Sequence, residues 1–552
     1  MYKSLLIHHN NVADVTMCDY NEYFQSTEDI DYYIHNTIID KIKEYDFDIV
    51  FVKDSLSNTY LEFYGLLMAY HIRLSVELKN KRFVPIVILS DVDGFTLNKI
   101  SQLATILFTQ NMFIAPNNTK SISDYLSLKK TKIDLETYQM DFLNTITVNP
   151  PENSTSHSIT NEWAIDQWSQ ILDITQKTQT NHEKISFMLY YKYLQTKYKL
   201  MKNYSKSIKQ KQNNGKILLI DDKWAEGWKD IVSTFIQLHY TDVTFETIEK
   251  INKNSTFDEI KLYVKEKINV EDSPNIVLLD LRLLDNENIQ INDTDEKSFI
   301  NKISGIKILK FIKELNPSIQ VIIFTASSDS MIIDEIYNNS ILGYIKKDSP
   351  TDKYLASKNS FSKLDSLVKK GLTYKYLKNI YKIQEEILQL NFLKNAKLVI
   401  GQDNNTVSIK NTIPQVFDIL NSNVPKPFLY AMYSIFKCIE YINDTYFREE
   451  NIDGRWSAIW KDTKTQQMIA GYSTEDRTTA IIKQRLQIPK NQEWVLQLIH
   501  EIVCSRNYNI HGGEEKSNCK NGLIKSPTEK NIENWFEMLY IILEQMDITH
   551  NG

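Results

Sequence analysis

The sequence has few cysteines, and this shortage excludes several classes of protein. Only four occur among 552 residues: Cys18, Cys438, Cys504 and Cys519. No two of them have the CxxC spacing of a zinc or redox motif. We therefore expect reduced thiols in a cytoplasmic protein, rather than disulfides or a structural zinc site.

Long apolar runs and excess positive charge are also absent. No run approaches the length of a membrane span, and the first residues do not resemble a signal peptide, so we expect no membrane association. The formal net charge of −6 argues against a generally basic nucleic-acid-binding protein. No recognition-helix signature is evident, which argues against direct DNA binding. A chain of this length is enough for about three or four domains.

Four short apolar segments carry the most informative pattern that is present. They are GKILLIDDK at 215–223, NIVLLDLRL at 275–283, VIIFTAS at 321–327 and GYIKKD at 343–348. The apolar runs are too short for helices and rich in β-branched residues, and stretches with helical periodicity separate them. This alternation predicts buried parallel strands in an α/β sheet.

Each predicted strand ends in polar residues that are suited to phosphoryl chemistry. These residues are Asp221, Asp222, Asp280, Thr325 and Lys347. Ligands sit at the carboxyl ends of the strands in such sheets, so the side chains should converge in one crevice. Three carboxylates there would repel one another unless a cation lay between them, and oxygen ligands suit Mg²⁺. A carboxylate beside Mg²⁺ and an ammonium group can attack a phosphoryl group.

This set of residues resembles the receiver domain of bacterial response regulators. The resemblance implies that Asp221 and Asp222 bind Mg²⁺ together with Asp280, and that Asp280 accepts the phosphoryl group from a cognate histidine kinase. It further implies that Thr325 is the switch hydroxyl and Lys347 the conserved lysine of the family, with the aromatic switch at Tyr344.

One segment departs from the receiver pattern. Residues from about 286 to 303 look like an insertion between the phosphoacceptor strand and the next helix, which puts access to the site in doubt. The alternative interpretation of the whole region is a degenerate α/β domain that keeps its acids by chance.

The amino-terminal region repeats the same pattern with its chemistry altered. Residues 1–11 align with 214–224, and 48–57 align with 275–284. On this alignment His8 and His9 replace the acid pair, Lys53 replaces the phosphoacceptor, and Ser90 takes the hydroxyl position. A lysine in that place opposes Mg²⁺ binding, so we expect a receiver-like domain that binds a partner or dimerises. The alternative is that the two histidines bind a metal or carry phosphate.

The carboxy-terminal region contains a second motif, CSRNYNIHGG at 504–513. Arg506, Asn507 and His511 resemble the R-x4–6-H motif of the HEPN superfamily of helical domains, many of which cleave RNA. The resemblance implies metal-independent RNA cleavage at a site shared between two copies of the chain. His511 would move a proton and Arg506 would hold the phosphate, with Asn507 orienting either residue. The alternative is a polar cluster that ties helix ends together without catalysis.

The expected architecture is two flavodoxin-like α/β receiver domains with parallel sheets and an all-α carboxy-terminal helical bundle. The predicted order is a receiver-like domain at 1–135, a helical linker region at 136–213, a receiver at 214–357, a helical connector at 358–410 and a HEPN-like output domain at 411–552. Helices are expected at about 413–445, 477–486, 491–505 and 528–547. His157, before an amphipathic helix in the linker region, is expected to be a surface or capping residue.

Together these features give one hypothesis and one alternative of a different class. In the first, phosphorylation of Asp280 controls a ribonuclease at Arg506 and His511, in stress or phage defence. In the second, the chain is a non-enzymatic phospho-signalling adaptor whose helical domain mediates dimerisation or partner binding.

Overall fold

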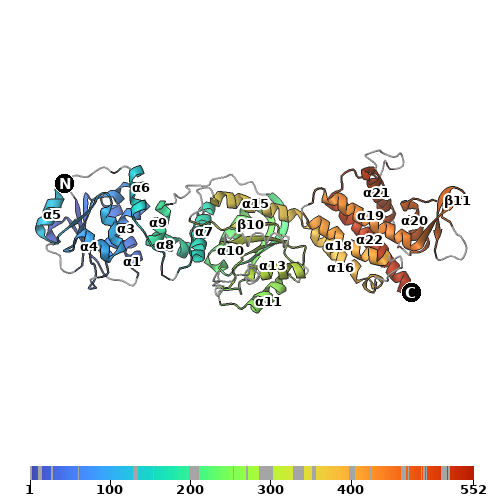
Figure 1. The fold of residues 1–552 in the computed structure, drawn as a ribbon, viewed down its shortest axis with the longest axis horizontal. Helices are drawn as coiled ribbons and strands as arrows, with labels where there is room; N and C mark the ends of the chain where they lie inside the picture. Colours follow the sequence, from blue (N-terminus) through green and yellow to red (C-terminus); the bar gives the residue numbers. More distant parts are fainter. Residues whose placement is uncertain are drawn as a thin grey trace.

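The structure is a computed structural model that describes residues 3–551 with several gaps. The gaps are residues 10–14, 26–28, 60, 128–132, 134, 153, 198–210, 253, 269–271, 285–302, 327–340, 351–355, 397–404, 423, 462–467, 470, 487, 489–491, 493, 511–518 and 520–521. The described elements form three bodies that follow one another in chain order along the long axis of the molecule (Figure 1). The insertion expected at 286–303 lies, apart from its last residue, outside the described residues.

The first body is an α/β unit around a five-stranded parallel sheet of order β2-β1-β3-β4-β5. Its strands are β1 Ser4–His8, β2 Tyr20–Tyr23, β3 Ile49–Lys53, β4 Ile86–Leu89 and β5 Met112–Ala115. Its helices include α1 Ile30–Tyr33, the π-helix Ile34–Ile39, α2 Asp40–Glu44, α3 Tyr64–Leu74, α4 Gly94–Ile100, α5 Thr119–Leu126 and α6 Leu135–Thr145. The central strands are buried because helices cover both faces of the sheet, and the strand order is the flavodoxin-like one.

The second body repeats this arrangement, with the sheet order β10-β9-β8-β6-β7. Its strands are β6 Lys211–Ile220, β7 Tyr240–Thr247, β8 Ile276–Leu279, β9 Gln320–Thr325 and β10 Gly343–Lys346. Its helices include α10 Trp228–His239, α11 Phe257–Ile268, α13 Ser304–Leu315 and α15 Ala356–Thr373. Phe361 and Leu364 of α15 are buried in the core of this body, so it continues beyond residue 357. Two parallel α/β sheets were predicted from the sequence, and the structure contains both.

Three helices connect these bodies, and the first of them takes part in both cores. They are α7 Ser156–Leu172, α8 Gln179–Phe187 and α9 Leu189–Lys197. Ala164, Ile165 and Trp168 of α7 are buried against the second body. Trp163, on another side of α7, and Leu189 of α9 are buried with the first body. Within the region expected to be a helical linker, the segment that contains α7, α8 and α9 is therefore helical and packed.

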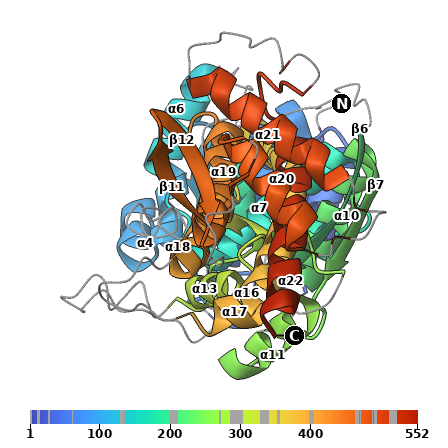
Figure 2. The same cartoon turned by 90° about the vertical axis from the view of Figure 1, so that its right-hand side faces the viewer.

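The third body is mostly helical and contains one two-stranded hairpin. Its elements are α16 Tyr376–Gln389, α17 Asn391–Lys394, α18 Asn405–Asn421, α19 Pro427–Tyr446, β11 Phe447–Ile452, β12 Arg455–Trp460, α20 Thr474–Gln484, α21 Trp494–Ile510 and α22 Glu529–Asn551. Figure 2 views this body from its end and shows the antiparallel hairpin beside α19. An all-α domain was expected, so the hairpin is a correction. The single helix expected at 413–445 is two helices, because Pro427 starts a new one at its first position.

Among the described residues, no helix is both long and apolar enough to cross a membrane.

The attachment of α9 to the first body depends on a buried group of ionisable side chains. The Lys192 ammonium, 1% exposed, lies 2.9 Å from Ser75 Oγ and 3.1 Å from His35 Nδ1. The fully buried His71 ring bonds to the Asp31 carboxylate at 2.9 Å. Burial, and then the Lys192 charge, lower the pKa of His71 to about 4.

We predict that acid weakens this attachment. Because the folded-state pKa of His71 lies below the unfolded value near 6.5, its stabilising contribution is complete above pH 6.5 and is lost as pH falls toward 4. The loss is about 3 kcal/mol once the pH reaches 4 and about 2 kcal/mol at pH 5. Hydrogen exchange of residues 189–197 at pH 7 and pH 5 measures it. A His71→Gln variant should show little of this change, and an equal change in both proteins would contradict the assignment.

Candidate functional site

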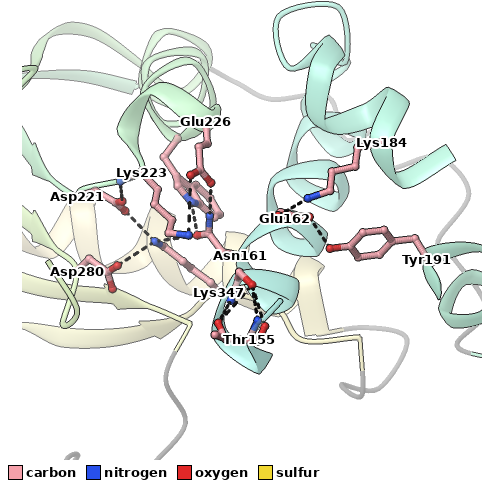
Figure 3. Close-up of polar contacts among 12 residues, drawn as sticks. Thr155, Asn161, Glu162, Lys184, Tyr191, Asp221, Lys223, Glu226, Asp280 and Lys347 are labelled. Atoms are coloured by element: carbon pink, nitrogen blue, oxygen red, sulfur yellow. Dashed lines mark hydrogen bonds and ion pairs between the residues drawn. The ribbon is translucent and has the colours of Figure 1, made fainter. Parts of the chain in front are cut away.

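The carboxyl ends of the strands in the second sheet hold the residues that the sequence predicted would converge. Asp221 and Asp222 follow β6, Asp280 follows β8, and Lys347 follows β10. Ligand oxygens of the three aspartates all lie within 4.8 Å of one another. Figure 3 shows Asp221, Asp280 and Lys347 pointing toward one another. The sheet therefore gathers three carboxylates around one ammonium.

The Lys347 ammonium is the centre of this arrangement. Its Nζ lies 2.7 Å from Asp221 Oδ2 and 3.5 Å from Asp280 Oδ2, and all three side chains are fully buried. The rings of Trp228 and Phe324 have their centroids 4.7 and 5.2 Å from the same atom. Both rings lie within the range of a cation–π contact with the ammonium.

Three carboxylates lie near the Lys347 ammonium, and the pKa values of Asp221 and Asp222 are raised. Burial, followed by the charges of Asp221 and Asp280, raises the pKa of Asp222 to about 8. Burial also raises the pKa of Asp221 against the opposing effect of Lys347. For Lys347 itself, burial lowers the pKa, but the two aspartates outweigh this and hold it above its usual value. The site therefore lacks positive charge.

The donor set fits a hard divalent cation. Asp222 Oδ1 and Asp280 Oδ2 are buried and make no hydrogen bond to any part of the chain that the structure describes. Unsatisfied carboxylate oxygens at this spacing are the ligands that Mg²⁺ takes, with water completing its shell. Asp221, Asp222 and Asp280 are thus the residues that would hold it.

The two predicted switch residues lie on adjacent strands beside the carboxylates. Thr325 ends β9 and is fully buried, and its carbonyl accepts the Lys347 N–H at 2.7 Å. Tyr344 on β10 is 9% exposed. Their roles in switching stay predictions, since residues 327–340 between them lie outside the described residues.

Helix α7 adds a residue to this site that the sequence analysis missed. Asn161 is fully buried, and its Oδ1 accepts from Trp228 Nε1 at 2.7 Å and lies 3.4 Å from Lys347 Nζ. The signal was present in the sequence: Asn161 shares the helical spacing of Ala164, Ile165 and Trp168, so a polar side chain lies on the apolar face.

His157 needs a correction. It was expected to be a surface or capping residue, but the capping box of α7 is formed by Thr155 and Ser158. His157 is half-buried in the first turn. Burial, followed by the nearby cations Lys347 and Arg282, lowers its pKa to about 3. The ring is therefore neutral at physiological pH and faces the charged site.

The strand pairing of the first sheet shows which of its residues correspond to the site residues of the second sheet. Counting from the paired strands, His8 occupies the place of Asp221 and Lys53 the place of Asp280. Ser90 likewise occupies the place of Thr325. These three equivalences agree with the alignment made from the sequence alone.

Two glycines support the same equivalence. A Cβ on Gly305 would lie 2.4 Å from the Asp280 carbonyl oxygen, and a Cβ on Gly65 would lie 2.0 Å from the Lys53 carbonyl oxygen. In both bodies the helix after the third strand thus approaches the strand end so closely that only glycine fits. Ser90 Oγ in the first body donates to Asp54 at 2.6 Å, which occupies that carboxylate.

Comparison with known families agrees with this geometry. Residues 1–115 match the family described as an inactive receiver domain. The match covers the five strands of the first body and ends before its helices α5 and α6. No curated protein sequence matches the chain. A match to an inactive receiver domain suggests a signalling-related role, and in this chain His8 and Lys53 stand at the positions of Asp221 and Asp280.

The carboxy-terminal motif is only partly within the described residues. Arg506 and Asn507 lie in the last turns of α21, and Arg506 Nη1 donates to Asn507 Oδ1 at 3.0 Å. The Arg506 guanidinium lies over the Phe436 ring, 4.7 Å from its centroid. His511 lies outside the described residues, so its position relative to Arg506 stays a prediction.

The cysteine prediction was wrong for one pair. Cys504 and Cys519 form a disulfide, while Cys18 and Cys438 are buried free thiols. The Cα atoms of the bonded pair are 5.5 Å apart, a separation that suits a disulfide. Their spacing of 15 residues gave no sign of this contact.

We predict that Cys519→Ser destabilises the third body by about 3 kcal/mol, the value expected for a loop of this length. Thermal unfolding of the non-reduced proteins measures the change. Reductant should lower the wild type to the level of the variant and leave the variant unaffected. Four alkylatable thiols in unreduced, denatured wild-type protein would contradict the disulfide.

Proposed function

We propose that this chain is a phosphorylation-controlled signalling protein in which Asp280 accepts a phosphoryl group. The observation that carries the proposal is the cluster of Asp221, Asp222 and Asp280, two of them fully buried, beside the ammonium of Lys347. A bound Mg²⁺ would supply charge neutralisation to the phosphoryl oxygens. The inactive receiver match in the first body supports a role in signalling.

In the proposed reaction, a carboxylate oxygen of Asp280 attacks the phosphorus of a phosphohistidine on a partner histidine kinase. The P–O bond to Asp280 forms as the P–N bond breaks, and the departing imidazole takes up a proton. Asp221 and Asp222 hold the divalent cation, and Lys347 balances charge on the transferred group. The Thr325 hydroxyl then donates to a phosphoryl oxygen of the resulting acyl phosphate.

A direct uptake experiment tests this reaction. Incubation with acetyl phosphate and Mg²⁺ should add one acid-stable, base-labile phosphoryl group per chain, as measured by intact mass. The same incubation in EDTA should add none, because the unshielded carboxylates repel the donor. Equal uptake in EDTA, or none with Mg²⁺, would be evidence against the proposal.

For the output we propose RNA cleavage by the third body. Support comes from the Arg506, Asn507 and His511 motif and from the position of the first two at the end of α21 in a helical body. The imidazole of His511 would take the proton of the RNA 2′-hydroxyl as that oxygen attacks the adjacent phosphorus. The P–O5′ bond breaks, which leaves a 2′,3′-cyclic phosphate, and the departing 5′-oxygen takes up a proton. Arg506 would bind the phosphate oxygens, and a second copy of the chain would complete the site.

We predict that Arg506→Ala lowers cleavage of total RNA at least about 100-fold, because the developing charge on phosphorus loses its guanidinium. Cleavage is followed by gel analysis with and without acetyl phosphate. Arg448→Ala on the β11 hairpin is the matched control, since Arg448 is exposed and its ion pair with Glu450 is peripheral. Undiminished cleavage by the Arg506 variant would exclude it from the site.

The adaptor alternative is favoured by one observation. The Arg506 guanidinium is already engaged by Phe436 and Asn507, as expected if it ties helix ends together. Phosphate uptake at Asp280 without RNA cleavage in either state would support this alternative.

A further inference from the structure

Asn161 lies between the phosphoacceptor site and the first body. Its Nδ2 donates to Glu226 Oε2 at 3.2 Å, and its Oδ1 accepts from Trp228 at 2.7 Å. The same Oδ1 lies 3.4 Å from Lys347 Nζ, farther than Asp221 Oδ2 at 2.7 Å and close to the 3.5 Å of Asp280 Oδ2 (Figure 3). A helix from outside the α/β unit thus contacts the ammonium that serves the site.

The rest of α7 is seated on the elements that carry the site. Trp168 Nε1 donates to Asp348, the residue after Lys347, at 2.6 Å. A Cβ on Gly227, which precedes α10, would lie 2.9 Å from Ile165 Cγ2. No free space separates α7 from these two elements. Movement at the end of β10 or at the start of α10 should therefore displace α7.

Of the contacts that Lys347 makes, the one with Asn161 should be the weakest when Asp280 is phosphorylated. A phosphoryl group adds three strong acceptor oxygens and more negative charge beside Lys347. The neutral amide oxygen of Asn161 competes poorly with these acceptors. Lys347 should therefore move toward the phosphoryl group and away from Asn161.

The adjacent residue, Glu162, points away from the site toward α8 and α9 (Figure 3). Its carboxylate accepts from Lys184 Nζ at 2.7 Å and from Tyr191 OH at 2.5 Å. Beyond Tyr191, α9 is anchored in the first body by Lys192 and by the bond from Leu189 N to Asp31 at 2.9 Å. Neighbouring residues of α7 thus contact the two bodies.

We propose that α7 transmits the state of Asp280 to the amino-terminal receiver-like body, with Asn161 as the positioning residue that senses Lys347. Phosphorylation breaks the contact between Asn161 and Lys347, and α7 then packs less tightly on the second body. The hydrogen bonds from Lys184 of α8 and Tyr191 of α9 to Glu162 change as a result. The amino-terminal receiver-like body then responds to the phosphorylation state of the second body. This inference rests on the proposed phosphorylation of Asp280 and adds an upstream output to it.

Hydrogen exchange with intact-mass analysis of the full chain tests the inference. In the wild type, acetyl phosphate and Mg²⁺ should speed exchange in 156–172 and 179–197 about tenfold, as expected for one lost hydrogen bond to a charged group. In Asn161→Ala, which lacks the contact with Lys347, α7 should exchange fast with or without the donor.

Two further variants separate sensing from simple loss of packing. In Asn161→Asp/Glu226→Gln, which keeps a donor beside position 161, the new carboxylate holds Lys347 more strongly, so α7 should stay protected after phosphorylation. In Glu162→Gln, α7 should respond to phosphorylation while 179–197 does not. Phosphate uptake by the wild type with unchanged exchange in α7 would overturn the inference and leave the proposed function standing. Absence of uptake would contradict both.

Discussion

Asp280→Asn should take up no phosphoryl group from acetyl phosphate, a loss of at least about 100-fold relative to the wild type. The amide has the shape of the carboxylate but lacks the anionic oxygen that attacks phosphorus. It also removes one of the three ligands for the divalent cation. Intact-mass analysis in the presence of Mg²⁺ measures the uptake directly.

Asp272→Asn is the matched control for that experiment. Asp272 lies before β8 in the same body, and its side chain is 87% exposed, with only a surface ion pair to Lys216. This control should be phosphorylated as the wild type is, because exposed ion pairs contribute little. Stoichiometric phosphorylation of Asp280→Asn would show that another residue is the acceptor.

Lys347→Met should destabilise the second body by about 3–5 kcal/mol, the range expected when one partner of a buried ion pair is removed. The methionine fills similar space between Trp228 and Phe324, so the loss is mainly electrostatic. Asp221 and Asp280 would remain buried without their cation. Hydrogen exchange of β6 and β8 measures the local stability of this body.

Divalent cations give this second prediction a specific signature. Because the proposed Mg²⁺ site forms only in the folded state, Mg²⁺ should stabilise Lys347→Met by about 2.7 kcal/mol at a hundredfold excess over the dissociation constant. Lys363→Met on the exposed side of α15 is the control and should match the wild type. Unchanged stability of Lys347→Met without Mg²⁺ would mean that the ammonium does not balance the buried acids.

The sequence predicted those site residues whose positions depend only on the geometry of the strands. Asp221, Asp280 and Lys347 each follow a short apolar run, and parallel strands bring their carboxyl ends to one edge. The same rule aligned His8 and Lys53 with the acids, since the two sheets share one strand order. Residues placed by a regular ladder can be predicted from local pattern.

Features that depend on the packing of distant segments were not predictable in this way. Asn161 reaches Lys347 across 186 positions of the chain, through the docking of a helix rather than through a ladder. The Cys504–Cys519 disulfide depends on the path of the chain after α21, which no local pattern encodes. The β11–β12 hairpin was missed because FREENI lacks the apolar alternation of a strand.

Chemical mapping of the phosphorylated residue tests the central claim most directly. The protein is incubated with acetyl phosphate and Mg²⁺, reduced with borohydride to trap the acyl phosphate, digested and sequenced by mass spectrometry. The account predicts that residue 280 alone is converted to homoserine in the chain. Conversion at another aspartate, or stable phosphate on His157 with Asp280 unmodified, would contradict it.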